Sequence, residues 1–149
     1  MGSLVGSLMM AAGRVTLALL KPDVAYGAHA VRECMRRITD AGLVVRAEST
    51  LTCTAEQAAS LYKEHEGRFY HARLIDHIRS GPVKAMVLEG DDAVARWRAM
   101  LGPSAMVKWA PGTIRASFGV TDTRNAAHGS DSASSAAREI AIFFPSFSI

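Results

Sequence analysis

Residues 15–23 read Val-Thr-Leu-Ala-Leu-Leu-Lys-Pro-Asp, and the fold follows from this stretch. Val15 to Leu20 is an uninterrupted apolar run headed by two β-branched residues, a pattern typical of a strand buried on both faces. Lys21-Pro22-Asp23 ends the run, because proline cannot donate a hydrogen bond to a sheet. We therefore predict a buried strand at 15–20 with a lysine directly after it.

Strand and helix patterns alternate along the rest of the chain. The predicted elements are, in order, a helix at about 24–40, a strand at 43–51, a helix from the Thr54–Gln57 capping box to about Glu64, a short helix at about 72–79, a strand at 83–88, a helix capped by Asp91-Asp92, a fourth strand at 113–120 and a last helix at about 132–144. With few strands and helices gathered to one side, this order favours an α+β fold: a ferredoxin-like sandwich with a four-stranded antiparallel sheet covered by helices.

Composition fits one globular domain. The 149 residues are 49% hydrophobic and 21% charged, with a formal net charge of +3. The basic residues are scattered along the chain, which favours a small anionic ligand at least as well as nucleic acid. A ferredoxin-like nucleic-acid-binding module is discounted, because its sheet would need stacking aromatic residues and these strands are aliphatic. We read Cys34 and Cys53 as reduced and structural, since their spacing matches no metal motif.

The first fourteen residues are set apart by composition. They are rich in Gly, Ser, Met and Ala and carry a single arginine, as a flexible start or a weak organelle-targeting segment would. No apolar run reaches the roughly 18 residues that a membrane span requires. We expect a soluble protein of the cytoplasm or the mitochondrion, with a flexible segment at 1–14 and the folded domain at 15–149.

One histidine stands out as a candidate nucleophile. Residues 125–132 read Asn-Ala-Ala-His-Gly-Ser-Asp-Ser and place His128 just before the start of a helix, where free amides attract anions. A neutral imidazole can attack phosphorus without a separate base. Its second nitrogen needs an orienting partner, and Glu139 with Ser130 could supply it if the last helix folds back beneath the loop. Taken alone, such a loop histidine is more often a plain helix entry.

Other polar residues stand where the predicted elements end. They are Lys21 after the first strand, Arg98 and Ser104 around the end of the helix that follows the strand at 83–88, and Arg115 on the predicted fourth strand. Forked arginine donors suit phosphate oxygens and stabilise a phosphoryl group in transfer. Arg98 could instead lie on a solvated helix face. A cation on an apolar strand, in contrast, needs a partner or a pocket, which makes Arg115 the stronger candidate.

The joint order of several motifs resembles one known family. The motifs are Ala18–Asp23, Tyr62 with Glu66–Tyr70, Ser80–Val83, Met100–Pro103, Pro111–Arg115 and Arg124–Ser132. Together they resemble the nucleoside diphosphate kinase family from Val15 to Phe144. Glu64–Phe69, Gly119–Arg124 and Phe143–Pro145 further resemble a divergent branch of that family.

The resemblance implies a role for each matching residue. His128 is implied to be the phosphorylated nucleophile, oriented by Glu139 and Ser130. Tyr70 is implied to stack on the base. The other implied nucleotide contacts are Lys21 and Asn125 at the ribose and the bent phosphate chain, Arg98, Ser104 and Arg115 at the phosphates, Tyr62 near the nucleophile and Arg68 near the phosphates. Magnesium is implied to arrive bridging the phosphates, with no protein metal site.

The chain also departs from the family pattern. Tyr70 replaces a usual phenylalanine, Ser104 a usual threonine and Ser117 a usual aspartate, and the tail after Phe144 is short. Because that tail and the loop from Gly102 to Pro111 help to build oligomers in the family, we expect a homo-oligomer but not firmly a hexamer. Two functions follow: a kinase that passes the γ-phosphate of ATP to a nucleoside diphosphate by a ping-pong mechanism, or a catalytically weak relative that acts through a partner.

Overall fold

The structure is a computed structural model that describes residues 13–149. Its elements are β1 (Val15–Leu20), α2 (Pro22–Ala25), α3 (Ala28–Asp40), β2 (Val44–Leu51), α4 (Ala55–Leu61), the 3-10 helix η1 (Lys63–His65), α5 (His71–Arg79), β3 (Val83–Glu89), α6 (Ala93–Leu101), the 3-10 helix η2 (Met106–Lys108), α7 (Ile114–Phe118), β4 (Ala127–Gly129) and α8 (Ala133–Phe143). The predicted segment 1–14 lies outside the described residues except for Gly13 and Arg14. The carbonyl oxygens of these two residues accept hydrogen bonds from the Val94 and Gly90 amides.

The sheet has the predicted four strands, all antiparallel, in the order β2-β3-β1-β4. β1 lies between β3 and β4, and its residues from Thr16 to Leu20 are fully buried. A strand with a helical layer on each face needs apolar residues at every position, which explains its uninterrupted apolar sequence. The ferredoxin-like α+β class is thereby confirmed.

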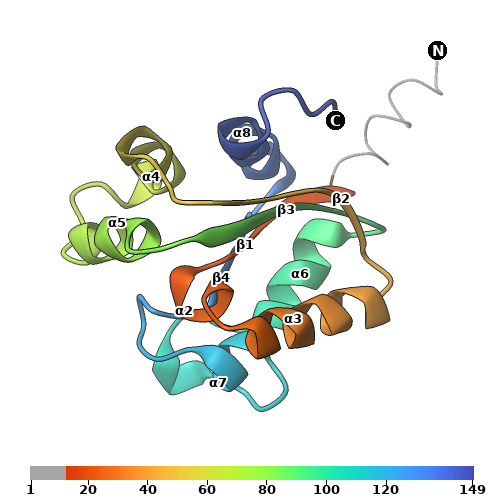
Figure 1. Cartoon of the computed structure of the whole chain (residues 1–149), viewed down its shortest axis with the longest axis horizontal. Coiled ribbons are helices and arrows are strands. Elements are labelled where there is room, and N and C mark those ends of the chain that lie inside the picture. Colours follow the sequence, from red (N-terminus) through yellow and green to blue (C-terminus); the bar gives the residue numbers. More distant parts are fainter. Residues whose placement is uncertain (1–12) are drawn as a thin grey trace.

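Helices cover both faces of this sheet, so the prediction that they gather to one side was wrong. Figure 1 shows α3 and α6 on one side of the sheet and α4, α5 and α8 on the other. The first layer buries Ala18 and Leu20 of β1 against Trp97 of α6, and the second buries Leu17 and Leu19. β1 therefore serves two cores through alternate residues.

The predicted fourth strand at 113–120 was also wrong, because Ile114–Phe118 form helix α7. The Thr113 hydroxyl accepts a hydrogen bond from the Ala116 amide and so caps the helix start, an interaction that outweighs the weak strand preference of Thr, Ile and Val. The actual fourth strand, β4, has three residues and contains His128. A strand this short shows no periodic pattern in the sequence.

Several predicted boundaries shift for local reasons. The helix expected at 24–40 is two helices, because the chain breaks at Tyr26 and Gly27. The Thr54–Gln57 capping box is confirmed, but its helix ends at Leu61 and not at Glu64. Asp92 occupies the cap position of α6 without a side-chain cap, while Asp91 pairs with Arg14.

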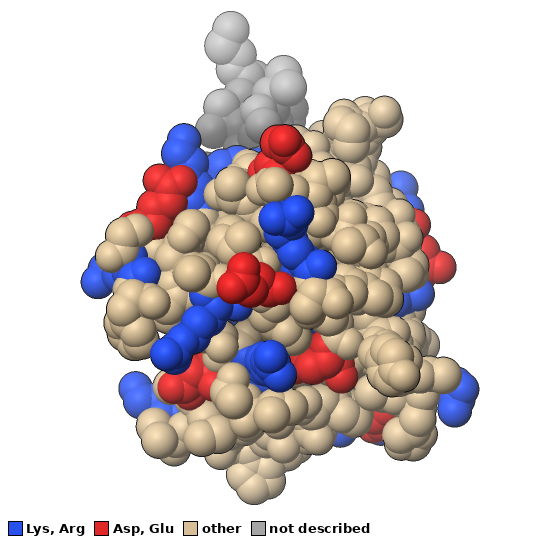
Figure 2. All heavy atoms as spheres, turned by 60° about the vertical axis from the view of Figure 1, so that its left-hand side comes forward, with Lys and Arg blue, Asp and Glu red and all other residues tan. Residues whose placement is uncertain are grey.

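Charged residues are mixed on the face drawn in Figure 2, where basic and acidic side chains alternate without a broad patch of one sign. That arrangement agrees with the scattered basic residues of the sequence. Among residues 13–149, no helix has the length and apolar character needed to cross a membrane.

Candidate functional site

A cavity of about 670 Å³ opens beside β4 and the carboxyl end of β1. This volume is within the usual range for a small-molecule site. Nine of the residues predicted from the sequence line it: Lys21, Tyr62, Tyr70, Arg98, Ser104, Arg115, Asn125, His128 and Glu139. Ser130 is fully buried directly beneath, whereas Arg68 is exposed and does not line the cavity.

His128 reaches the cavity because β4 pairs with β1 in a fixed register. It stands opposite Leu19, so both side chains point to the face that α8 covers. There the His128 Nε2 contacts the carboxylate of Glu139, a residue that is only 4% exposed. An ionised carboxylate can only accept a hydrogen bond, which assigns the proton to Nε2 and the lone pair to Nδ1. No residue among 13–149 bonds that Nδ1, and the side chain is 19% exposed.

Ser130 links this pair to the body of the sheet. Its hydroxyl lies 3.4 Å from Glu139 Oε1 and can donate to it, while it accepts a hydrogen bond of 3.3 Å from the Leu17 amide. The sequence predicted Ser130 as an orienting residue, and the structure adds a contact with the backbone of β1. Glu139 is thereby held from two sides.

Lys21 and Asn125 form a second polar pair in the cavity. The Lys21 Nζ donates to Asn125 Oδ1 at 2.9 Å, and Lys21 is 3% exposed. Burial, with a smaller contribution from the Arg115 charge, lowers the pKa of Lys21 to about 7 despite the opposing effect of Asp23. The amine is therefore close to half-protonated at neutral pH, and an arriving anion would favour its charged form.

Arg115 lies on helix α7 and not on a strand, yet it still turns to the cavity. Its guanidinium donates to the backbone oxygens of Gly102 at 2.6 Å and Ala127 at 3.1 Å, while its Nε is buried and has no partner among the described residues. Burial and then the Arg98 charge lower the pKa of Arg115 to about 10, so it remains charged at neutral pH. Arg98 donates to the Gly129 oxygen at 3.3 Å. Two cations therefore converge beside His128.

Aromatic residues form another wall. The Tyr62 ring meets the His128 ring edge-on with 6.5 Å between centroids, and its buried hydroxyl has no partner within 13–149. Burial raises the pKa of Tyr62 well above its ordinary value. Tyr70 lies further out, where its hydroxyl is 3.0 Å from His65 Nδ1.

Two contributing residues were missed by the sequence reasoning. Asp122 lines the cavity and accepts a 2.7 Å hydrogen bond from the Met106 amide, which ties two loops together. Asp23 accepts a hydrogen bond from the Ala126 amide, two residues before His128. Both stand inside the motifs that carry the family resemblance, and this was the one available signal, because neither has a pattern of its own.

Fold and cavity together define an α+β protein of the ferredoxin-like class with a cationic pocket centred on one histidine. Comparison with known proteins specifies the class further. The family model for nucleoside diphosphate kinase matches residues 14–149, and the chain belongs to this family. It is therefore a member of a group of nucleotide-binding phosphotransferases.

Individual relatives give the same result. Human nucleoside diphosphate kinase 6 is 42% identical over 138 residues, covering 91% of this chain and 74% of the human protein, and the Xenopus tropicalis protein of the same name is 39% identical over 137 residues, covering 90% and 76%. The resemblance to a divergent branch is thus to the one represented by nucleoside diphosphate kinase 6.

Solved structures agree with the fold. The nucleoside diphosphate kinase of Aquifex aeolicus superposes with a TM-score of 0.82 at 37% identity, covering 88% of this chain and 94% of that one. The enzyme of Encephalitozoon cuniculi superposes with a TM-score of 0.84 at 27% identity, covering 88% of each chain.

Proposed function

We propose that this protein transfers the γ-phosphoryl group of ATP to a nucleoside diphosphate through a phosphohistidine at Nδ1 of His128. The observation that carries the proposal is that the two nitrogen atoms of the His128 ring have different environments. Glu139 holds Nε2, and Nδ1 has no partner among the described residues although the ring lines a cationic cavity.

The reaction takes place in two halves. In the first, the Nδ1 lone pair attacks the γ-phosphorus, the bond to the bridging oxygen breaks, and the diphosphate leaves with that electron pair. In the second, a terminal oxygen of another diphosphate attacks the same phosphorus and the phosphorus–nitrogen bond breaks. The proton stays on Nε2 throughout, where Glu139 stabilises the positive charge that develops on the ring.

The cavity supplies the electrostatic stabilisation that this transfer needs. Arg98 and Arg115 face the phosphates together with the Ser104 hydroxyl, while Lys21 and Asn125 hold the ribose and the phosphate chain. Tyr70 offers its ring to the base, and a flat aromatic surface accepts any base with weak discrimination. The exposed Arg68 receives no contact in this proposal.

Magnesium enters with the nucleotide in this scheme. Among the described residues, no three His, Cys, Asp or Glu side chains cluster as a metal site. The cavity is instead rich in side chains that can donate hydrogen bonds to phosphate oxygens. The phosphates themselves are therefore the ligands we propose for the ion, and magnesium supplies additional neutralisation of phosphate charge.

Intact-protein mass spectrometry tests the proposal directly. The protein is mixed with ATP and magnesium and analysed without acid, which hydrolyses phosphohistidine. We expect one phosphoryl group that disappears on addition of GDP. His128→Ala should show none, while His29→Ala, which changes an exposed histidine on α3, should behave as the wild type.

The opposite result has a defined meaning. If the wild type binds ATP but gains no phosphoryl group, the transfer proposal fails and the alternative of a catalytically weak interaction protein is favoured.

A further inference from the structure

The backbone just before His128 is held in an unusual conformation. Ala126 has φ +79°, one of two non-glycine residues with positive φ among the described residues, and it is fully buried. The Ala127 amide donates to the Asn125 oxygen at 3.0 Å, which is the hydrogen bond of a three-residue turn with Ala126 at its centre. Turns of this hand are rare and strained, so the surroundings must hold this one in place.

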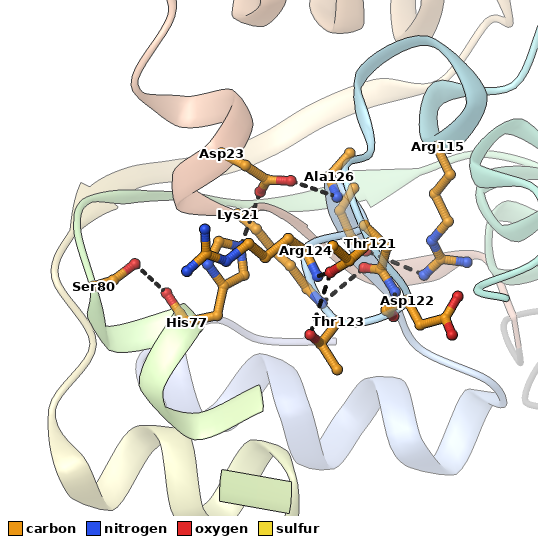
Figure 3. A network of polar contacts seen from close by, with 12 residues as sticks. Lys21, Asp23, His77, Ser80, Arg115, Thr121, Asp122, Thr123, Arg124 and Ala126 are labelled. Carbon is orange, nitrogen blue, oxygen red and sulfur yellow. Dashed lines mark hydrogen bonds and ion pairs between the residues drawn. The ribbon is translucent and has the colours of Figure 1, made fainter. Parts of the chain in front are cut away.

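Both backbone groups of Ala126 are held by the segment that follows β1. Its amide donates to Asp23 Oδ2 at 2.9 Å, and its carbonyl accepts from the Lys21 amide at 2.9 Å. This turn also fixes the positions of the two residues beside Ala126. Asn125 accepts a hydrogen bond from the Lys21 amine, and Ala127 is the first residue of β4. Figure 3 shows Asp23 pointing to Ala126 on one side and to His77 on the other.

His77 completes the arrangement from helix α5. Its Nε2 lies 3.1 Å from Asp23 Oδ1, and the side chains of His77 and Asp23 are 8% and 9% exposed. A buried carboxylate needs donors for both oxygens, and His77 provides the one that the Ala126 amide does not. The Asp23 carboxylate is thus fixed in direction by a residue that does not line the cavity.

We propose that Asp23, fixed by His77, is a positioning residue for the reaction at His128. Its carboxylate stabilises the left-handed turn at Ala126, and the turn sets both the Lys21–Asn125 pair and the entry of the chain into β4. The inference rests on the proposed transfer through His128. It adds Asp23, a residue that contacts neither the nucleotide nor His128.

A double-mutant cycle with Ala126→Gly tests this role. Glycine adopts positive φ without the steric cost of a Cβ, so a chain carrying Ala126→Gly needs Asp23 less. We expect Asp23→Ala to slow phosphorylation of His128 at saturating ATP by about 10- to 100-fold, the factor that corresponds to a strain of a few kcal/mol. The same change made together with Ala126→Gly should slow it by less than about threefold relative to Ala126→Gly alone.

Two further variants separate positioning from loss of stability. His77→Gln keeps a donor for Asp23 and should retain most of the rate, whereas His77→Leu should lose it. Ile78→Val, which trims a buried neighbour on α5, should lower the melting temperature and leave the phosphorylation rate unchanged.

The amide of Ala126 gives a readout that does not depend on transfer. Its hydrogen-exchange protection, measured by NMR, should fall in Asp23→Ala while that of the β1 amides persists. Wild-type protection of Ala126 in Asp23→Ala, or an equal slowing of phosphorylation with and without Ala126→Gly, would overturn the inference. A wild-type protein that takes up no phosphoryl group would instead overturn the proposed function.

Discussion

The Trp97 indole nitrogen donates a 2.9 Å hydrogen bond to the backbone oxygen of His128. Helix α6 is thereby tied to the strand that carries the candidate nucleophile, through a side chain that is fully buried. The contact is possible because the next residue is glycine. A Cβ at Gly129 would lie 2.7 Å from Trp97 Cδ1, closer than carbon atoms can approach.

We therefore expect Gly129→Ala to destabilise the fold by about 1 to 3 kcal/mol, as overpacking of a core usually does, and to lower the rate of His128 phosphorylation. Urea denaturation and mass spectrometry measure the two effects. Gly27→Ala is the matched control, because its Cβ would meet no atom closer than 3.8 Å, and it should be neutral or slightly stabilising. Equal stability of the two variants would contradict the packing argument.

Nucleotide binding should be coupled to protonation of Lys21. Its pKa of about 7 leaves the amine mostly neutral at pH 8, and the phosphates of a diphosphate should raise that pKa again. Binding at pH 8 should therefore take up a proton, to an extent approaching one per site. Calorimetry in buffers of different ionisation enthalpy measures this uptake. It should vanish in Lys21→Met, and an uptake that persists in that variant would assign the proton to another group.

Folding stability should depend on pH through the same residue. Between about 7, the folded pKa, and 10.5, the ordinary value, the unfolded chain holds the Lys21 proton and the folded chain releases it. Stability contributed by this residue must then rise with pH across that window and be lowest below pH 7. Urea denaturation at pH 7 and pH 9 should show a gain for the wild type that is smaller in Lys21→Met. An identical gain in both proteins would refute this assignment.

Glu139→Gln should show how much of the orienting effect depends on the negative charge of the side chain, because glutamine has nearly the same shape without the charge. The amide can still meet His128 Nε2, but it lacks the charge that stabilises the ring as phosphorus–nitrogen bonding develops, so we expect phosphorylation to slow by at least about tenfold. Ser130→Ala should slow it less, since its hydroxyl lies 3.4 Å from the same carboxylate oxygen. Rapid-quench measurement of the phosphoenzyme compares the two. A greater loss in Ser130→Ala would reverse their assigned importance.

Arg115→Ala should weaken nucleotide affinity by about 2 to 5 kcal/mol, as expected on removing one partner of a buried charge pair. Part of this loss should come from the protein itself, because Arg115 also holds the backbone oxygens of Gly102 and Ala127. Arg115→Lys keeps the charge but not the fork and should recover only part of the affinity. Calorimetry with a diphosphate is the measurement, and unchanged affinity in Arg115→Ala would refute a phosphate role.

The fold class and most of the cavity could be predicted from the sequence because their signals are local. β1 is covered by helices on both faces, and its uninterrupted apolar run indicates this directly. β4 was missed because three residues carry no period, and its place in the sheet is set by pairing with β1. The segment that forms α7 was predicted as a strand for a different reason, because its Thr, Ile and Val favour strands and the Thr113 cap was not recognised. Arg115 itself was nevertheless predicted to face a pocket.

Asp23 marks the limit of local reasoning. A single aspartate after a proline has many possible roles in a sequence, and its contact with Ala126 spans 103 positions. Arg68, predicted from a motif to lie near the phosphates, is exposed and does not line the cavity, so its nucleotide contact stays a prediction. Long-range contacts of single polar side chains are what the sequence left open.

The hydrogen bond from the Leu17 amide to Ser130 has an evolutionary consequence. Ser130 and Glu139 are buried and bonded within the folded chain, so selection for a stable protein alone is enough to retain them. The presence of Ser130 and Glu139 in a related protein is consequently weak evidence that phosphoryl transfer has been retained. The Nδ1 atom of His128, in contrast, forms no hydrogen bond with another of the described residues. In a lineage released from catalysis, drift should therefore appear first at position 128, in side chains such as glutamine that can still donate to the buried Glu139 carboxylate.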